Sequence, residues 1–584
     1  MKLTVTKSKN SASFFVQKTI RKSNGHVSSV TVEKLGNLDA VRKKAGGADP
    51  YAWAREYVEE LNRREKEGQQ EIIQRFSQTK LIQKGQKRRF NTGYLFLQDI
   101  YYELGIDRIC SDISERNGFR YDLDGIFSRL VYSRILYPDS KRATFTLSKR
   151  FLEQPTFGLH QIYRALSVLS GENDFIQEQL FSNNPYAGHD GKGVLYYDCT
   201  NYSFEIEQED DFRRFGHAKN HRPSPIVQMG LFMDRHGMPL AFDLSPGNTN
   251  EQLTLKPLEE KVIHDLGIGK IVVCTDAGLS GNANRRFNNR GGRSFITTQS
   301  IKTLTEELQD FCLSPEGWRL PGSDAVYDIR ALDEEKEKDR IFFKETWLPE
   351  DRRKRKKEDA LEPDLEQHLI VTYSIRYRDY LRSIRNGQIE RARKMVDDGR
   401  KPRRGRNQND PARFVACDHM TQDGESADGE VYYLDSGRID SEERYDGFYA
   451  VCTNLDEDVS TVIGINKNRW QIEECFRILK SEFNAQPIYL QREDRIRAHF
   501  IVCFTALLVY RILERKLDNK YTCEEILNTL LDMEMFSSGE KMGYVPLFER
   551  TDITDALHKS FGFRTDYEIM TDSRIRQIIK KTKV

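Results

Sequence analysis

The sequence Lys270-Ile271-Val272-Val273-Cys274-Thr275-Asp276 is the clearest indication of the fold class of this chain. A continuous apolar run of this length, ended by an acid, is typical of a strand that is buried on both faces, as parallel strands are. Parallel strands need a crossover connection, and the preceding residues, 253–266, have the apolar spacing of a helix. The run therefore predicts an α/β domain in this part of the chain.

Four further strands are predicted around this one. They are residues 194–198, 226–233, 239–244 and 294–298. The first of them again ends in an acid, Asp198, and the turn Asp234-Arg235-His236-Gly237 separates the second from the third. Three hairpin-like strands, a helix, a strand, a helix and a strand describe a mixed α/β sheet.

A third acid lies much later in the chain. After an apolar run at 447–452, a helix is predicted to begin near Ser460 and to carry Arg469-Trp470-Gln471-Ile472-Glu473 and Lys480. Arg469 and Glu473 stand one turn apart on this helix, and Lys480 lies two turns further on. That helix face offers one carboxylate for a divalent metal and two cations for phosphate.

Asp198, Asp276 and Glu473 are therefore the candidate catalytic and metal-binding residues. The C-terminal ends of strands are where α/β sheets present groups to ligands. Mg²⁺ binds through a few carboxylates and takes further ligands from phosphate oxygens. Two such ions about 3.5–4 Å apart activate the attacking oxygen and stabilise the leaving oxygen of a phosphoryl displacement. The three acids predict a site for two Mg²⁺ ions, with Mn²⁺ able to substitute.

Each of these residues has a structural alternative. An aspartate at the end of a strand is commonly a turn or N-cap residue. Arg469 and Glu473 would form an ordinary helix ion pair worth about 0.2–0.5 kcal/mol. Lys480 would be a solvated lysine, and Trp470 a core residue of an amphipathic helix. The joint occurrence of the three acids favours the metal site.

The length and charge of the chain bound its organisation. A chain of 584 residues is expected to fold as several domains. Lys and Arg (91) nearly balance Asp and Glu (90), but residues 1–90 contain 20 basic residues and 9 acidic ones. This local excess favours a nucleic-acid-facing N-terminal region, and a solvated basic face or a disordered start is the alternative.

Cysteine usage and hydropathy indicate a compartment. Nine cysteines without any C-x-x-C pair argue against a zinc knuckle and a disulfide framework, and indicate a reducing cytosol. The N-terminus has no apolar signal core. The longest apolar run, residues 499–510, is shorter than the about 20 residues of a membrane span and predicts a buried core helix. We expect a cytoplasmic protein with no membrane partner, associated with the nucleoid when bound to DNA.

Four short motifs resemble those of one family. They are Tyr197-Asp198-Cys199-Thr200, Gly247-Asn248-Thr249, Asp276-Ala277-Gly278 and Arg469-x3-Glu473-x6-Lys480. Together they resemble the sequence blocks of DDE transposases from the IS-four superfamily of bacterial insertion sequences. The stretches at 216–223 and 445–448 resemble the subgroup with a long β-rich insertion. The resemblance implies a ribonuclease-H-like core, with the insertion between the second aspartate and the glutamate.

The resemblance also implies how the chain would hold DNA. Arg469 and Lys480 would contact phosphates, and Trp470 would stack on an unpaired base near the cleavage site. The chain departs from the family signature at Asn466, where the family has a tyrosine associated with handling the DNA end. This departure bears on DNA contact at that position and leaves the three acids unaffected.

Six regions are predicted along the chain. They are a basic N-terminal region with a hairpin and a helix (1–90), a helical DNA-binding region (91–188), the first part of the ribonuclease-H-like core (189–305), an insertion (306–440), the second part of the core (441–515) and a C-terminal helical region (516–584). The hairpin is expected over residues 12–35, around Ser23-Asn24-Gly25.

The insertion is expected to be β-rich and charged. It contains predicted strands near 324–330 and 368–374, a helix over 376–398, and basic runs at 352–357 and 400–406. The basic runs are either a DNA-contacting arm or a charged excursion with no specific role.

The predicted function is DNA transposition. Metal-dependent hydrolysis would cut the phosphodiester at the terminal inverted repeats of a mobile element, and the freed 3′-hydroxyl would attack target DNA. Joining two ends implies a homodimer on DNA. The alternatives are a nuclease that cuts and never joins, and a catalytically silent DNA-binding protein derived from a transposase. A zinc hydrolase using His217 and His221 is disfavoured, because the glutamate of H-E-x-x-H is missing and Pro223 follows.

Overall fold

The computed structural model of the chain describes all residues except 9–10, 22–26, 69–76, 188–191, 217–223, 267–269, 351–363, 400–408, 421–425 and 538–542. The chain divides into two compact units. The N-terminal unit comprises Met1–Arg88 with Ser537–Val545 and Tyr567–Asp572, and the main unit comprises Arg89–Phe536 with Pro546–Asp566 and Ser573–Val584.

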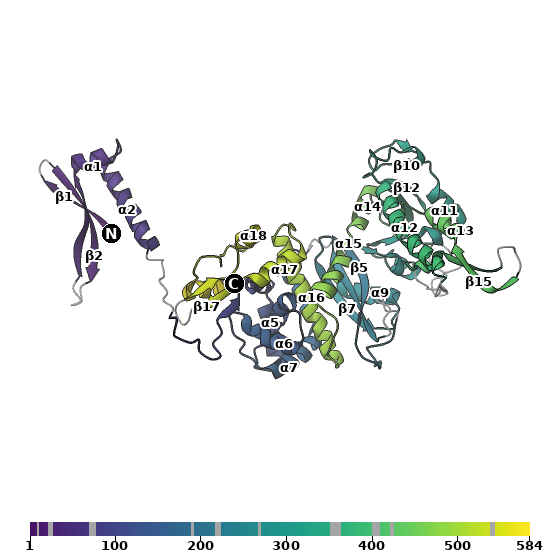
Figure 1. Cartoon of the computed structure of the whole chain (residues 1–584), viewed down its shortest axis with the longest axis horizontal. Helices are drawn as coiled ribbons and strands as arrows, with labels where there is room; N and C mark the ends of the chain where they lie inside the picture. The colour runs from purple at the N-terminus through teal and green to yellow at the C-terminus, as the bar shows by residue number, and fades with distance from the viewer. Residues whose placement is uncertain are drawn as a thin grey trace. The chain divides into compact units, whose positions relative to one another are not determined.

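The N-terminal unit has a three-stranded sheet with two helices packed against it (Figure 1). Its elements are β1 (Lys2–Ser8), β2 (Ser11–Arg21), β3 (Val27–Asn37), α1 (Leu38–Lys44) and α2 (Pro50–Gly68). The antiparallel pairing of β2 with β3 confirms the predicted hairpin, whose turn lies outside the described residues. Alternate residues of β2, including Phe14 and Val16, face a small core completed by Val41 and Val58 from the helices.

The main unit begins with a group of helices. They are α3 (Tyr94–Glu103), α4 (Ile106–Asn117), α5 (Leu123–Leu136), α6 (Lys141–Leu147), α7 (Leu159–Gly171) and α8 (Asn173–Asn183). The long helix α16 (Glu493–Lys516) contacts α3, α5 and α7 as well as strand β7 (Pro239–Pro246) (Figure 1). Helix α16 therefore connects the helical region to the sheet.

Helix α16 contains the longest apolar run of the chain and confirms the prediction of a buried core helix. Every residue from Ala498 to Leu513 is buried. By length and composition it is the one helix of the described residues that could cross a membrane, but 94% of its most apolar window is buried inside the protein. A core helix meets the same length and composition test.

A ten-stranded sheet forms the centre of the main unit, in the order β11-β10-β12-β13-β16-β9-β8-β5-β6-β7. Its last five members are β9 (Arg293–Thr298), β8 (Lys270–Thr275), β5 (Lys192–Ser203), β6 (Ile226–Asp234) and β7 (Pro239–Pro246). Strands β5, β6 and β7 form an antiparallel meander, α9 (Glu251–Leu266) follows, and β8 and β9 run parallel to β5. This is the predicted mixed α/β sheet, and it is consistent with a ribonuclease-H-like core.

The segment predicted as an insertion adds strands to this same sheet. Strands β10 (Trp318–Arg319), β11 (Val326–Tyr327), β12 (Phe342–Trp347) and β13 (His368–Tyr373) continue it beyond β16 (Phe448–Thr453). The predicted strand near 324–330 is reduced to the two residues of β11, whereas β13 matches the predicted strand at 368–374. Both basic runs lie outside the described residues.

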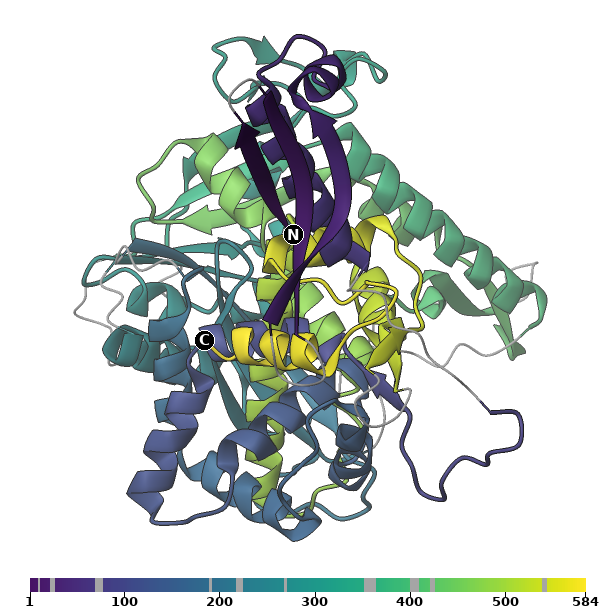
Figure 2. The same ribbon diagram turned by 90° about the vertical axis from the view of Figure 1, so that its left-hand side faces the viewer.

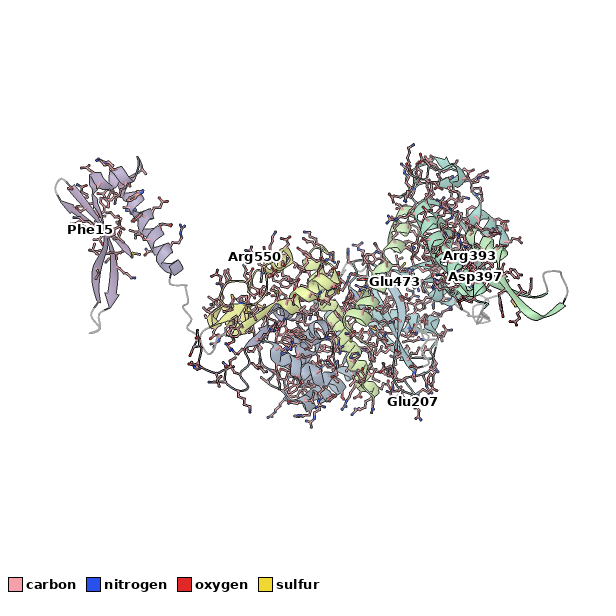
Figure 3. The ribbon with its side chains drawn as sticks, in the orientation of Figure 1. Phe15, Glu207, Arg393, Asp397, Glu473 and Arg550 are labelled. Atoms are coloured by element: carbon pink, nitrogen blue, oxygen red, sulfur yellow. The ribbon has the colours of Figure 1, made fainter. Side chains whose placement is uncertain are left out.

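Helices and a separate hairpin also belong to this segment. They are α11 (Glu306–Leu313), α12 (Ile375–Asp397), α13 (Ser436–Glu443), β14 (Val415–Met420) and β15 (Ser426–Leu434). Helix α12, the long blue-green helix in Figure 2, confirms the predicted helix at 376–398. Its C-terminal turn carries Arg393 and Asp397, which are labelled in Figure 3.

The C-terminal part of the chain contains helices and also two short strands. The sequence pattern did not predict the two strands. The elements are α17 (Cys523–Asp532), β17 (Glu534–Ser537), β18 (Tyr544–Pro546), α18 (Asp552–Phe561) and α19 (Asp572–Lys581). Strand β17 pairs with β4 (Arg89–Asn91), more than 400 residues earlier in the chain.

Candidate active site

Asp198 and Asp276 lie level with each other on neighbouring strands. The parallel pairing of β5 and β8 ends at Tyr196 and Cys274, and each aspartate stands two residues beyond that pair. Because paired strands are about 4.8 Å apart, this register brings the two aspartates to the same edge of the sheet. Asp276 also accepts a hydrogen bond at 3.1 Å from the backbone N–H of Leu279, so it caps the short helix η2 (Ala277–Leu279).

The prediction that the first strand ends at Asp198 is wrong. Strand β5 continues to Ser203, past the end of β8, because its later residues remain paired with β6. Side chains on one face of a strand alternate, so Asp198, Thr200 and Tyr202 share the face opposite to that of Cys199. Cys199 belongs to the apolar core on the other face.

The segment carrying Glu473 is not one helix, as predicted, but three short ones. They are α14 (Val459–Lys467), α15 (Trp470–Arg477) and a π-helical turn, η8 (Ile478–Glu482). Arg469 directly precedes α15 and has helical backbone angles, so Arg469 and Glu473 still stand one helical turn apart, as predicted. The Arg469 guanidinium lies 3.4 Å from the Glu473 carboxylate. Helix α15 packs against β5, and Glu473 is labelled in Figure 3.

Arg469 carries a positive charge among the candidate metal ligands. Burial acts to lower the pKa of its guanidinium, but nearby groups raise the pKa overall. The largest of these contributions comes from Tyr449, and the carboxylates of Glu473 and Asp198 add to it. The charge of Arg469 therefore interacts with acids of both β5 and α15.

Lys480 is anchored on the same face of β5. Its Nζ donates a hydrogen bond of 2.6 Å to Oγ1 of Thr200 and lies 5.2 Å from the ring centroid of Tyr202. The alternative of a solvated surface lysine is therefore excluded. Thr200 stands in the quoted first-aspartate motif, but its role as the anchor was missed because nothing in the sequence relates it to a residue 280 positions later.

Trp470 and Asn466 occupy the neighbouring turns. Trp470 is 58% exposed, which excludes the core alternative for its indole ring. Asn466 lies at the end of α14, and its buried side-chain oxygen has no hydrogen-bond partner. Tyr449 of β16 also acts on Arg469, whose pKa it raises.

The donor set fits a hard divalent cation. All three candidate ligands are carboxylates, which Mg²⁺ prefers, and none of them is fully buried. Asp555, His558 and Asp566 are the one group of three acid, His or Cys residues in the described part of the chain whose ligand atoms all lie within 4.8 Å of one another. Asp198, Asp276 and Glu473 are thus spread more widely than ligands of a single ion, with Arg469 among them.

The Asp555, His558 and Asp566 cluster was not predicted from the sequence. Arg564 donates hydrogen bonds of 2.6 Å to both aspartates, and Arg550, labelled in Figure 3, pairs with Asp555. Because these carboxylates already have cationic partners, the cluster is an ion-pair network that a metal ion would have to displace.

Asp446 also belongs to an ion pair. The sequence around it predicts a turn, and Gly447 does adopt a positive φ of 86°. The buried Asp446 carboxylate accepts two hydrogen bonds of 2.6 Å from Arg385 of α12. His217 and His221, the candidate zinc ligands, lie outside the described residues.

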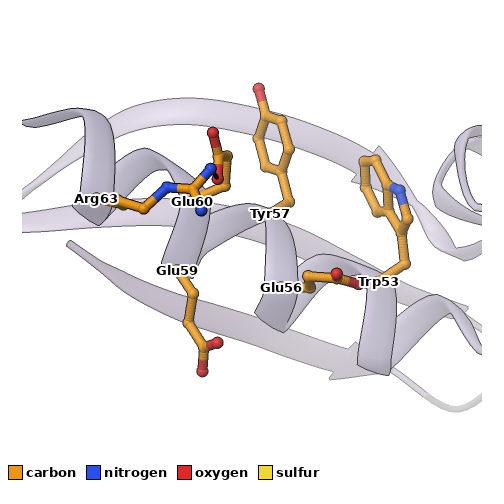
Figure 4. A pocket seen from close by; sticks show the side chains of 6 residues that line it. All are labelled: Trp53, Glu56, Tyr57, Glu59, Glu60 and Arg63. Atoms are coloured by element: carbon orange, nitrogen blue, oxygen red, sulfur yellow. Dashed lines mark ion pairs between the residues drawn. The ribbon is translucent and has the colours of Figure 1, made fainter. Parts of the chain in front are cut away.

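The N-terminal unit contains a hollow of a different character, along one side of α2 (Figure 4). Trp53 and Tyr57 stack there with ring centroids 5.3 Å apart. The other lining residues are Glu56, Glu59, Glu60 and Arg63. Glu60 pairs with Arg63, and the remaining two carboxylates make this hollow unfavourable for a phosphate.

The sheet order is that of a mixed α/β protein, and it is consistent with a ribonuclease-H-like core. A family model described as "Transposase DDE domain" matches residues 191–509, more than half of the chain, and the protein belongs to this family. A piggyBac transposase, in a cryo-EM structure of its synaptic complex with hairpin DNA, is 9% identical, with a TM-score of 0.34 over 84% of this chain and 83% of that one. No protein of curated function matches the sequence.

Proposed function

We propose that the protein is a cut-and-paste transposase of a bacterial insertion sequence, of the subgroup with a β-rich insertion, and that Asp198, Asp276 and Glu473 hold two Mg²⁺ ions. The observation that carries this proposal is the level position of Asp198 and Asp276 on adjacent parallel strands. Membership of the DDE transposase family supports it. When bound, the ions would activate the attacking oxygen and stabilise the leaving one, and Mn²⁺ would substitute for Mg²⁺.

Two displacements complete the proposed reaction. In the first, water attacks the phosphorus at the end of the element, and the 3′ oxygen leaves as a hydroxyl. In the second, this 3′-hydroxyl attacks a phosphodiester of the target and displaces the 3′ oxygen of the target strand. Arg469 and Lys480 would hold phosphates by charge-assisted hydrogen bonds, and the exposed Trp470 would stack on an unpaired base.

Other parts of the chain would position the DNA. The basic N-terminal region (1–90), the helical region (91–188) and the segment 306–440 would grip the terminal inverted repeats, while 189–305 and 441–515 form the catalytic core. Two ends must be held together for transfer, so the active form would be a homodimer on DNA. The protein would act in the cytoplasm, on the nucleoid.

The test compares four full-length variants on DNA that carries the sequences flanking the coding region. Asp198→Asn, Asp276→Asn and Glu473→Gln are each expected to lower Mg²⁺-dependent strand cleavage by at least about 100-fold and to leave binding of the DNA end unchanged. Glu474→Gln is the matched control, since Glu474 is the next residue of α15 and pairs with Arg477. It should cut at the wild-type rate.

The results distinguish the proposed function from its rivals. Retained cleavage in all three variants would contradict the metal site. Cleavage by the wild type, with no joined product from pre-cut ends, would identify a nuclease. Sequence-specific binding without any Mg²⁺-dependent cleavage by the wild type would identify a silent DNA-binding protein.

A further inference from the structure

A pocket of about 300 Å³ in the main unit carries three basic side chains outside the candidate active site. Its walls come from the end of α5, the start of α6, helix α7, the segment 484–490 after η8, and α16. The basic residues are Arg134, Lys141 and His499, and one acid, the exposed Asp139, also lines the pocket.

Lys141 is the buried cation of this pocket. Lys141 is 5% exposed, and its Nζ lies 3.3 Å from Nδ1 of His499. Nε2 of His499 lies 3.0 Å from the carbonyl oxygen of Ala485, which fixes it as the protonated nitrogen and leaves Nδ1 as an acceptor for Lys141. No carboxylate of the described residues pairs with Lys141. Two of its three N–H donors therefore remain for a ligand.

Arg134 adds a second buried charge without an acidic partner. It donates to the backbone carbonyls of Phe483 (3.0 Å), Asn484 (3.3 Å) and Asp139 (3.1 Å). Its Nε is buried and has no hydrogen-bond partner. These contacts hold the 484–490 segment in place as one wall of the pocket.

Buried charges without counter-charges are costly, so this arrangement requires a reason. Burial, and next the guanidinium of Arg134, lower the pKa of the Lys141 ammonium to about 7. Burial and then Lys141 lower the pKa of His499, which keeps its ring neutral. An anion in the pocket would supply the charge that the protein does not.

We propose that this pocket binds a backbone phosphate of the transposon DNA, away from the phosphate that is cut, with Lys141 as its main contact. This inference rests on the proposed function, because it names DNA as the source of the phosphate. A phosphate oxygen accepts hydrogen bonds from ammonium and guanidinium groups more strongly than a neutral acceptor does.

The walls of the pocket favour a phosphate that is part of a nucleic acid. Tyr163, Pro487, Ile488 and Tyr489 line it, and Tyr489 is 73% exposed. Aromatic and apolar side chains at the rim suit the sugar and base next to a phosphate, whereas free phosphate would make no use of them. The guanidinium of Arg495, 5.1 Å from the ring of Tyr163, adds positive charge there.

The pocket is connected to the candidate active site through packed residues. The ring of Tyr202, which faces Lys480, packs edge-on against Phe500 at 4.8 Å, and Phe500 is the neighbour of His499 in α16. The backbone N–H of Ser203 at the end of β5 donates to the side chain of Gln486 at 3.4 Å. The pocket and the face of β5 that carries Lys480 are therefore joined by packed residues.

The test measures DNA binding by the full-length protein as a function of salt. Lys141→Met removes the charge and keeps an apolar side chain of similar length. We expect it to bind a duplex of the element's end about tenfold more weakly at low salt, with a salt slope smaller by about one. Arg142→Met is the matched control, because Arg142 is the next residue and is exposed. It should leave both quantities unchanged.

Single methylphosphonate substitutions identify the phosphate. At one position along the strand, the neutral linkage should weaken binding by the wild type and have no further effect on Lys141→Met. Urea unfolding checks the fold, and the Lys141→Met protein should unfold at no lower urea concentration than the wild type, because a buried unpaired charge has been removed.

Three results would overturn the inference. The first is equal affinity and salt slope for Lys141→Met and the wild type. The second is an equal loss in Arg142→Met, which would indicate general electrostatic attraction. The third is stabilisation of the wild type by inorganic phosphate, absent in Lys141→Met, with unchanged DNA affinity, which would assign the pocket to free phosphate. If the wild type neither binds nor cuts the element's end, it is the proposed function that fails.

Discussion

Among single residues, Arg469 is the cation that interacts with the acids of the candidate metal site. It forms an ion pair with Glu473 and is also influenced by the charge of Asp198. In the absence of metal, a cation in this position offsets the repulsion between the carboxylates. Metal ions bound as proposed would therefore compete with Arg469 for the same acids, and a DNA phosphate would give the guanidinium another partner.

Replacing Arg469 should separate metal binding from DNA handling. Without DNA, Arg469→Gln is expected to bind Mn²⁺ a few-fold more tightly than the wild type, since removal of a nearby charge changes the energy by about 1 kcal/mol in a partly solvated site. With DNA and saturating metal, the same variant should cut more slowly. Titration calorimetry with Mn²⁺ and a cleavage assay measure the two effects. Arg477→Gln, which removes a partner of Glu474, serves as the control. Weaker Mn²⁺ binding by Arg469→Gln would contradict the competition.

The residues of the site differ in how far the sequence could predict them. Asp198 and Asp276 could be found because apolar runs mark the strands that carry them. The spacing of Glu473 and Lys480 placed them on one helix face, and the resemblance to a family motif supported their link to the two aspartates. Lys141 could not be found, because its partner His499 is 358 positions away and a lone lysine beside a serine has no periodic signal.

At the level of helices and strands, the apolar spacing of the sequence does not predict where a helix breaks or which distant strands pair. The apolar spacing of 459–482 fits one helix, yet the structure has a break at Asn468 and a π-helical turn at Ile478–Glu482. A π-helical turn shifts the direction of the side chains that follow, and here it carries Lys480 to Thr200. The pairing of β13 with β16 joins His368 to Thr453, and this non-local contact makes the predicted insertion part of the core sheet.

Helix α16 supports both the helical region and the central sheet. Leu507 is fully buried in the middle of this helix, which contacts α5 and α7 on one side and β7 on another. Leu507→Ala should lower the free energy of unfolding of the main unit by about 2–5 kcal/mol. Because one helix supports both regions, hydrogen exchange should accelerate together in α5, α7 and β7. Glu493→Ala, at an exposed position of the same helix, should change stability by less than about 0.5 kcal/mol. Faster exchange in the helical region alone would show that α16 does not couple the two.

At the scale of the whole molecule, the chain contains two compact units, each with a hydrophobic core of its own. The core cluster of the N-terminal unit is small, with seven buried apolar residues among those that the structure describes, so its stability depends strongly on each of them. If this unit grips the ends of the element, as proposed, loss of its fold should affect binding of DNA and spare the chemistry.

Phe14→Ala tests this division of roles. Phe14 of β2 is fully buried, and its truncation should cost about 3–5 kcal/mol, which is enough to unfold a unit of this size. Hydrogen exchange should then become fast over β1–β3 and α1–α2 and remain unchanged in α16 and the central sheet. In cleavage assays with the element's end, the DNA concentration needed for half-maximal rate should rise, while the rate at saturating DNA should stay within about twofold of the wild type. Thr4→Ala, at a partly exposed position of β1, is the control and should change neither quantity. A lower saturating rate with unchanged half-saturation would assign the N-terminal unit to the chemical step and contradict its proposed role in gripping DNA.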